Sequence, residues 1–340
     1  MINLKTSYMG LELKNPIIAG ASNLVTNPKT LKKIEESGAA AIVYKSLFEE
    51  QMQLENLELY ERRTEYEERH AEMVTLFPDS HKDMSYPVQH IENIKKAKQT
   101  VSIPVFASIN AVSDEIWVEY AKELEKTGVD GLELNFYTTP EKFDDSYEEI
   151  EKKQLKTFKK VRAAVKLPLA VKLSPFYSNP LKLISDLENA GANAFVLFNR
   201  LFQADIDINT EEHQYPYSLS NVEDNRLPMR FAGLLYGNIK SSICTSSGIF
   251  RGYDVIKMIL SGSDSVQVVS TLYLNQVGVI ATMLEEIGKW MDSKGYSSLE
   301  SFRGKLSKNR LNDKLPYYRA QYFDFQMSTT AILKKYKIIS

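Results

Sequence analysis

The sequence has very little cysteine and no long apolar run. Cys244 is the single cysteine among 340 residues, which excludes an intrachain disulfide framework and a multi-cysteine metal site. No apolar stretch approaches the roughly 20 residues that a membrane helix needs. The first residues, Met1 to Lys5, run into a polar segment and do not resemble a signal peptide. We therefore expect a cytoplasmic protein without a membrane-spanning segment.

An excess of one charge and the usual metal-binding patterns are missing as well. The chain has 42 basic and 44 acidic residues, so no general affinity for nucleic acid or anionic membranes is expected. The four histidines show no H-x-x-x-H spacing, and we expect no metal site. No G-x-G-x-x-G motif follows the first apolar segment, so the dinucleotide fingerprint is absent. These absences leave a small molecule as the expected substrate.

The sequence does have a regular alternation of apolar segments and amphipathic helices. Such alternation predicts a parallel sheet, and eight repeats predict a closed (β/α)8 TIM barrel. An open doubly wound sheet is the alternative. The expected strands are residues 16–20, 39–44, 103–108, a run ending at Asn135, 167–171, 194–198, 241–244 and 265–269. The expected helices are residues 28–37, 87–100, 113–127, 145–165, 180–190, 229–236, 252–260 and 277–294.

Two long segments and the end of the chain interrupt this alternation. The segments at about 48–86 and 202–228 are not periodic, and we expect them to be insertions on the carboxyl-end face of the barrel. Residues 1–306 would form one barrel domain, and residues 307–340 an extension packed on its outside. A small hairpin with Met9 and Gly10 at its turn is expected before the first strand.

Polar and small residues stand where the expected strands end. Enzymes with parallel barrels carry their chemistry at this face, and lysine is rarely buried without a partner. Each residue alone could be a surface or turn residue, but their coincidence on one face predicts a site. The set consists of Gly20, Ala21, Ser22, Lys45, Ser46, Asn110, Asn135, Lys172, Asn199 and Arg200.

The last two expected strands are followed by small residues and turns. Thr245–Gly252 precedes a helix, and Ser270 and Thr271 follow the final strand. Barrels often hold a phosphate group at this place, where backbone N–H groups and a helix amino terminus converge. Ordinary turns are the alternative. A phosphate site at one edge and lysines with amides in the middle would suit a phosphorylated planar cofactor across the barrel mouth.

Several motifs together resemble the dihydroorotate dehydrogenase family. They are Asn15-Pro16 with Gly20-Ala-Ser22, Val43-Tyr-Lys45-Ser46, Glu133-Leu-Asn135, Val171-Lys172-Leu-Ser-Pro175 and Ser247-Gly248-Ile-Phe-Arg-Gly-Tyr-Asp254. The resemblance covers roughly residues 4 to 306 and is greatest to the soluble class 1 enzymes. It implies a flavoprotein that binds FMN and a place in pyrimidine biosynthesis.

The resemblance also assigns roles to individual residues. It would place Gly20, Ala21 and Ser22 against the isoalloxazine ring and Lys172 beside its N1 atom. Lys45, with Ser46 and Asn110 nearby, and Asn135 would lie next to both flavin and substrate. Ser247, Gly248, Ser270 and Thr271 would hold the phosphate, and the substrate would contact Lys45, Asn135, Asn199 and Arg200. A cation near N1 would stabilise the negative charge of the reduced ring.

The chain departs from the family where the substrate should bind. After Asn135 the sequence reads Phe-Tyr-Thr-Thr-Pro, so Thr138 stands at the position of a cysteine or serine base and Pro140 replaces an asparagine. An N-S-M-G-L-P-N stretch is absent, and Ala71–Phe77 is there instead; the Gly-rich segment before the sixth helix is replaced by Asn221–Arg230. Arg200 replaces a small residue. The cofactor half matches, whereas the substrate half is rebuilt.

The most favoured interpretation is an FMN-dependent oxidoreductase that acts on CH–CH bonds. Hydride would pass between a small planar anionic substrate, dihydroorotate or a relative of it, and flavin N5. Lys172 and Asn135 would assist, and Thr138 or Tyr137 would handle the proton. Two alternatives stay open: a barrel lyase or aldolase with a Schiff base at Lys172, and an FMN-binding protein without catalysis. Candidate protein partners are a second copy of the chain and a separate electron acceptor.

Overall fold

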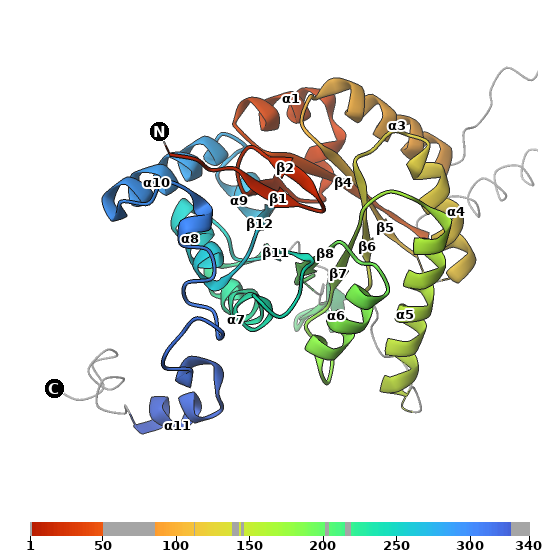
Figure 1. The fold of residues 1–340 in the computed structure, drawn as a ribbon. Coiled ribbons are helices and arrows are strands. Elements are labelled where there is room, and N and C mark those ends of the chain that lie inside the picture. The colour runs from red at the N-terminus through yellow and green to blue at the C-terminus, as the bar shows by residue number, and fades with distance from the viewer. Residues whose placement is uncertain are drawn as a thin grey trace, which may run out of the picture.

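The centre of the molecule is a closed barrel of eight parallel strands with helices around it (Figure 1). The computed structural model describes residues 2–49, 86–111, 113–137, 143, 146–200, 204–214 and 219–327. Strand order follows the chain, and the last barrel strand pairs with the first. The strands are β3 (Ile17–Ala19), β4 (Ala41–Phe48), β5 (Val105–Asn110), β6 (Gly131–Asn135), β7 (Leu169–Leu173), β8 (Ala194–Leu197), β11 (Ser242–Ser246) and β12 (Ser265–Val268). The predicted TIM barrel is confirmed, and the doubly wound alternative is wrong.

The outer helices lie where the alternation predicts them. Two of them begin with an Asn-Pro pair: the Asn27 side chain accepts a hydrogen bond from Lys29 N, and Asn179 accepts one from Lys182 N. An asparagine cap followed by proline is a strong helix start, because the missing proline N–H is not needed there. The helices are α1 (Pro28–Glu36), α3 (Tyr86–Thr100), α4 (Asp114–Glu125), α5 (Tyr147–Ala164), α6 (Pro180–Asn189), α7 (Arg226–Leu235), α8 (Gly252–Ser261), α9 (Ser270–Leu274) and α10 (Val279–Lys294).

The segment at 202–228 contains more regular structure than its sequence predicts. It holds an antiparallel hairpin, β9 (Asp205–Asp207) with β10 (Glu212–Gln214), and a 3-10 turn, η2 (Val222–Asn225). Asn221 and Asp224 form a capping box at the start of η2, which leads directly into α7. The helical run therefore starts at η2, and α7 continues it from Arg226, before residue 229 and without a side-chain cap of its own. Most of the segment at 48–86 lies outside the described residues.

The apolar core has two layers, one inside the barrel and one between the strands and the helices. Ile18, Phe106 and Val196 belong to the inner layer, which the hairpin of β1 (Thr6–Tyr8) and β2 (Leu11–Leu13) covers at the amino ends of the strands. Tyr8 packs edge-on against Phe106, with ring centroids 5.5 Å apart. The hairpin is as predicted, and its turn residues Met9 and Gly10 both have positive φ, the conformation that a tight hairpin turn requires.

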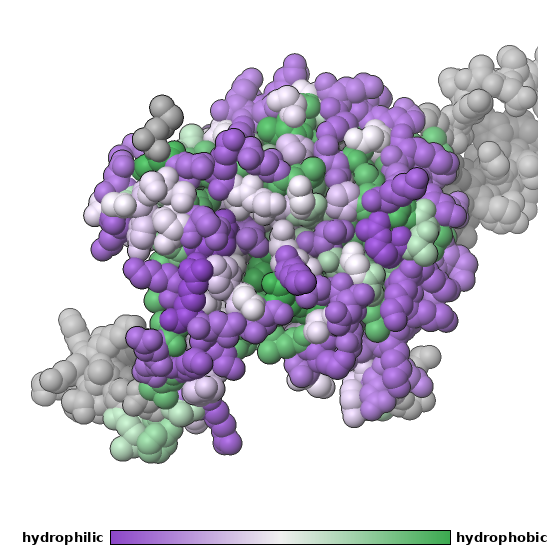
Figure 2. All heavy atoms as spheres, in the orientation of Figure 1, coloured by the Kyte–Doolittle hydropathy of each residue, from purple (hydrophilic) through white to green (hydrophobic). Residues whose placement is uncertain are grey.

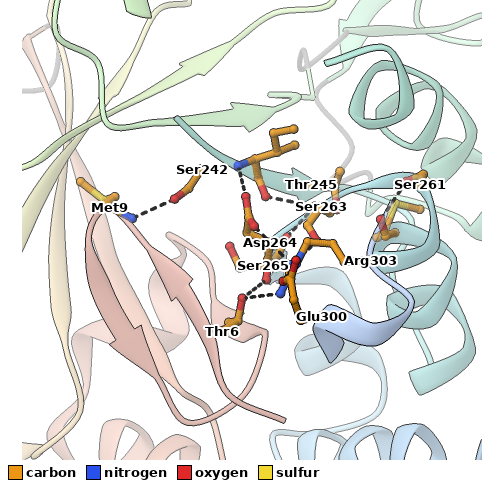
Figure 3. Close-up of polar contacts among 12 residues, drawn as sticks. Thr6, Met9, Ser242, Thr245, Ser261, Ser263, Asp264, Ser265, Glu300 and Arg303 are labelled. Carbon is orange, nitrogen blue, oxygen red and sulfur yellow. Dashed lines mark hydrogen bonds and ion pairs between the residues drawn. The ribbon is translucent and has the colours of Figure 1, made fainter. Parts of the chain in front are cut away.

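A buried arginine joins this amino end to the last part of the barrel (Figure 3). Arg303 is 5% exposed and donates hydrogen bonds to the Ser263 carbonyl at 2.6 Å and to Thr6 Oγ1 at 3.0 Å. It also forms ion pairs with Asp264 at 3.3 Å and Glu300 at 2.9 Å. The hydrogen bonds satisfy a charge that would be costly to bury alone.

The residues after the barrel pack against α7 and then turn outward. Arg230 donates to the carbonyl groups of Pro316 and Tyr317, and the Tyr317 hydroxyl donates to the Leu306 carbonyl at 2.6 Å. The final described helix is α11 (Ala320–Met327), seen as a pale green apolar patch in Figure 2 on an otherwise largely polar face. The domain boundary at residue 306 stays a prediction. None of the described helices is both long and apolar enough to cross a membrane.

Candidate functional site

A cavity of about 600 Å³ opens at the carboxyl ends of the barrel strands, the opposite end from the β1–β2 hairpin. Its volume is in the range of pockets that bind small molecules and cofactors. Most of the residues that the sequence singles out line it: Ala21, Ser22, Lys45, Ser46, Asn110, Asn135, Tyr137, Lys172, Asn199, Arg200, Ser247, Gly248 and Ser270. The structure therefore brings together both the expected cofactor residues and the expected substrate residues.

Two of the predicted site residues that the structure describes, Gly20 and Thr271, do not line the cavity. A Cβ atom at Gly20 would lie 2.7 Å from the Val269 side chain, so this glycine allows β3 to approach its neighbour. Thr271 is fully buried, and its hydroxyl donates to the Phe250 carbonyl at 3.2 Å. Both residues support the cavity wall from behind. Thr138, the predicted base, lies outside the described residues.

A β-bulge explains why two consecutive residues of β4 both face the cavity. The pairing register of β4 and β5 shifts between Tyr44 and Leu47, which turns Lys45 and Ser46 toward the barrel mouth. The Ser46 hydroxyl shares a 2.7 Å hydrogen bond with the Ser108 hydroxyl of β5. This bond fixes the bulge, and with it the place from which the lysine side chain leaves the strand.

Lys45 has a buried histidine behind it. Burial and, to a lesser extent, the positive charge of Lys45 together lower the pKa of His90 to about 4. His90 is therefore neutral near pH 7 and packs edge-on against Tyr44, with ring centroids 5.4 Å apart. Lys45 therefore supplies the positive charge on this side of the cavity, and the neutral imidazole of His90 adds none.

Lys172 is held by two side chains inside the barrel. Its ammonium donates to Gln267 Oε1 at 3.3 Å and lies 3.6 Å from Glu133 Oε1. Gln267 in turn donates from Nε2 to Glu133 Oε2, which closes a ring of three polar groups. Glu133 and Gln267 are each 1% exposed, and Lys172 is 9% exposed. The barrel thus presents one fixed cation to the floor of the cavity.

The edge of the cavity between β11 and β12 is built from strained backbone and hydroxyl groups. Ser247 and Gly248 both have positive φ, at 78° and 68°, a conformation that serine adopts rarely and that concentrates at functional sites. The N–H of Gly248 donates to Ser220 Oγ at 3.3 Å, and that hydroxyl donates to Ser270 Oγ at 2.7 Å. Converging N–H and hydroxyl groups of this kind suit a phosphate.

The ends of β6 and β8 carry amides and an arginine, and β8 is the neighbour of β11 in the barrel. Asn199 Nδ2 donates to Asn135 Oδ1 at 3.0 Å, which joins the ends of β6 and β8. The Arg200 side chain forms an ion pair with Asp224 of η2 at 3.6 Å. Among the described residues that line the cavity, Lys45, Lys172 and Arg200 are positively charged and none is negatively charged. The site therefore favours an anionic ligand.

Three residues of the site were missed by reasoning from the sequence. Glu133 and Gln267 are polar residues in the middle of otherwise apolar strands, and this alone could have marked them as inward-facing. Nothing in the sequence marks Ser220, because it lies in a segment without hydrophobic periodicity. It contacts Ser270 only in the folded chain. Together with the predicted residues they could hold a phosphorylated planar cofactor.

Comparisons with known proteins agree with this geometry. The profile of the family described as dihydroorotate dehydrogenase matches residues 3–291. A dihydroorotate dehydrogenase B (NAD(+)) catalytic subunit from Thermoplasma volcanium is 26% identical over 321 residues, covering 89% of this chain and 98% of the relative. The same-named subunit from Methanocella arvoryzae is 27% identical over 297 residues, covering 84% of this chain and 92% of the relative.

A third relative carries a different name. A putative dihydroorotate dehydrogenase A (fumarate) from Aeropyrum pernix is 26% identical over 310 residues, covering 88% of this chain and 96% of the relative. The family match spans most of the chain and includes all eight barrel strands. The resemblance predicted from the motifs is confirmed, as is membership of a family of dehydrogenases: the chain belongs to the dihydroorotate dehydrogenase family.

Proposed function

We propose that this protein is an FMN-dependent dehydrogenase that transfers hydride between flavin N5 and a small planar anionic substrate, dihydroorotate or a related compound. One observation carries the proposal. The buried cation Lys172 and the converging donors at Gly248 and Ser270 open into the same cavity. A phosphorylated ring that needs a positive charge at one end of its conjugated system fits both features.

The residues at the two sides of the cavity fit the two ends of FMN. The Gly248 N–H, with the hydroxyls of Ser220 and Ser270, would hold the phosphate. Lys172 would lie beside the flavin ring, with Ala21, Ser22 and Asn110 against it. When bound, FMN would supply the hydride acceptor. The chain supplies the fixed charge, which stabilises a developing anion without reorganisation.

The substrate side rests on three contacts. Asn135 and Asn199 are held together by their 3.0 Å hydrogen bond and would orient a planar substrate through their remaining amide groups. Lys45 would attract its negative charge. Thr138 or Tyr137 would take up the proton; Tyr137 lines the cavity, and Thr138 follows it in sequence.

The two alternatives have less support. A Schiff-base lysine is activated by a desolvated or cationic environment, whereas Lys172 lies beside the Glu133 carboxylate. A flavin-binding protein without turnover would not need the three cations and two linked asparagines that line the open part of the cavity. We therefore favour an enzyme.

A spectrum and a reduction experiment test this proposal. Purified protein should show the absorption bands of an oxidised flavin, and heat release should yield FMN rather than FAD or riboflavin. Candidate dihydropyrimidine carboxylates should then bleach the bound flavin without oxygen. Protein that binds no flavin after incubation with FMN would rule the proposal out. Trapping of a carbonyl substrate on Lys172 by borohydride would favour the aldolase instead.

Partners follow from the names of the relatives. Two of the relatives above are named catalytic subunits of an NAD(+)-dependent enzyme, and such a subunit works with another chain. We propose that a separate protein accepts the electrons here, because Cys244 is the single cysteine and cannot hold an iron–sulfur cluster. From the same family resemblance we propose that the chain associates with a second copy of itself and that it is located in the cytoplasm.

A further inference from the structure

Glu133 lies in the middle of β6, and its side chain points into the barrel toward β7 and β12. It forms the ring of polar groups with Lys172 of β7, the next strand in the sequence, and with Gln267 of β12, which is 134 positions away. Among the described residues, Glu133 Oε1 has no hydrogen-bond partner; its neighbour is the Lys172 ammonium at 3.6 Å. This oxygen is therefore stabilised by charge alone.

The floor beneath the ring is apolar. Ala170, Val196 and Cys244 belong to the inner layer of the barrel below it. Burial raises the pKa of the Cys244 thiol to about 12, and the negative charge of Glu133 acts in the same direction. A carboxylate over such a floor cannot be screened by water, so its interaction with Lys172 is much stronger than that of a surface pair.

We propose that Glu133 is a positioning residue that acts on the cofactor through Lys172. It holds the lysine ammonium at the barrel mouth and partly neutralises its charge. The flavin ring is therefore exposed to the combined charge of Lys172 and Glu133. Gln267 fixes the geometry by accepting from the lysine and donating to the carboxylate. The part of this inference that concerns the flavin rests on the proposed function.

The pair should control how much better the reduced flavin is bound than the oxidised flavin. The reduced ring carries a negative charge and the oxidised ring does not, so a carboxylate behind the lysine weakens binding of the reduced form. Replacement of Glu133 by an uncharged residue of the same shape removes this repulsion. The ratio of the two affinities sets the reduction potential of the bound flavin relative to that of free flavin, so this potential should rise.

The first experiment measures that potential. Glu133→Gln should favour the reduced flavin by roughly tenfold, which is about 30 mV for a two-electron couple. The matched control is Asp264→Asn, which removes a carboxylate that pairs with the buried Arg303 at the far end of the barrel. It should leave the potential unchanged. An unchanged or lowered potential in Glu133→Gln would overturn the inference.

The second experiment needs no flavin. Thermal unfolding of the cofactor-free protein is compared for Glu133→Gln, Lys172→Met and the double variant. Lys172→Met should lower the midpoint most, because it leaves the carboxylate buried without its cation. The double variant should recover more than half of that loss. Additive effects would show that the two side chains are not coupled.

Gln267 offers a variant that keeps both charges. Gln267→Met removes two hydrogen bonds and keeps a similar side-chain volume. Because it acts beside the isoalloxazine ring, which FMN and riboflavin share, it should weaken the binding of both by the same factor. Gln154→Met is the matched control, since this buried glutamine of α5 accepts a hydrogen bond from the Tyr177 hydroxyl. Equal losses in both variants would overturn the role of Gln267. A protein that binds no flavin would refute the proposed function, while the unfolding cycle would still decide the coupling.

Discussion

The two ends of the barrel bury the same kinds of groups and use them differently. At the amino end, Arg303 gives its hydrogen bonds to Thr6 and a backbone carbonyl, and a hairpin covers it. At the carboxyl end, Lys172 is held from below and faces a cavity. A buried cation whose donors are all used inside the chain contributes to stability, whereas one that borders a cavity can act on a ligand. Substitutions at the two ends should therefore separate stability from function.

The largest effect is expected for the chemistry at the cavity. Thr138 stands in the sequence where the family has a cysteine or serine base, and a threonine hydroxyl is a poor base unless it is activated. A general base is typically responsible for about 100- to 10,000-fold in rate. We predict that dihydroorotate reduces the bound flavin slowly or not at all, by a factor in that range relative to known members of the family. Stopped-flow bleaching of the flavin measures it.

The neighbouring threonine gives the control for this prediction. Thr138→Cys should raise the rate if the cavity admits dihydroorotate, and Thr139→Cys should not. Fast bleaching in the unmodified protein would show that Tyr137 or another group serves as the base, and the carboxyl end would then be a less altered site than its sequence indicates.

A large loss of stability is expected at the amino end. Arg303→Met removes two buried hydrogen bonds and leaves the partly buried Asp264 without its cation. Removal of one partner of a buried pair typically costs about 3–5 kcal/mol, and the 25% exposure of the Asp264 side chain places the expected loss at the lower end of that range. Chemical unfolding measures this, and the ratio of FMN to riboflavin affinity should stay unchanged. Arg226→Met is the control, because the Arg226–Glu223 pair is exposed; it should change stability by less than about 0.5 kcal/mol. A changed ratio of FMN to riboflavin affinity in Arg303→Met would show that the amino end of the barrel also affects ligand binding.

A smaller effect of pH is expected beside the cavity. The pKa of His90 falls to about 4 on folding, against about 6.5 in an unfolded chain. The unfolded chain binds the proton more readily, so the stability from the neutral histidine is present above pH 6.5 and is lost as the pH falls through 4. Between pH 8 and pH 5 the loss is about 2 kcal/mol.

Replacement of the ring isolates this contribution. His90→Phe keeps the edge-on contact with Tyr44 and cannot titrate, so its unfolding free energy should fall less between pH 8 and pH 5 than that of the unmodified protein. Equal pH dependence in both proteins would show that His90 is exposed to water in solution.

The smallest effect is expected at the phosphate edge. Ser220→Ala removes one hydroxyl from the converging donors and should weaken FMN by roughly two- to tenfold, the range for one hydrogen bond, while riboflavin binding stays the same. Ser242→Ala is the matched control, since its hydroxyl accepts from Met9 N at the amino end. Tighter binding of FMN by Ser220→Ala would show instead that this hydroxyl competes with the phosphate.

Much of the fold could be read from the sequence, because it depends on local signals. The apolar strands and the Asn-Pro helix starts at residues 27 and 179 are features of short stretches. Lys172 was identified for the same reason, as a charge at the end of an apolar run. The family motifs then supplied the roles of the cavity residues, which stay predictions until a ligand is measured.

The remainder depends on contacts between distant segments. The bulge that turns both Lys45 and Ser46 inward is set by pairing with β5. The side chains of Lys172, Glu133 and Gln267 meet only because β12 faces the paired strands β6 and β7 across the barrel. No single stretch of sequence contains these relations.

The hydrogen bond between Arg303 and Thr6 joins residues that are 297 positions apart. During synthesis the β1–β2 hairpin leaves the ribosome before the barrel strands, but Arg303, which binds it, emerges only after all eight of them. The inner apolar layer therefore stays incompletely covered until the whole barrel has been made. Contacts of such long range slow folding and prolong the exposure of apolar surface. We expect the newly made chain to depend on molecular chaperones, and a chain truncated before residue 303 to aggregate rather than fold.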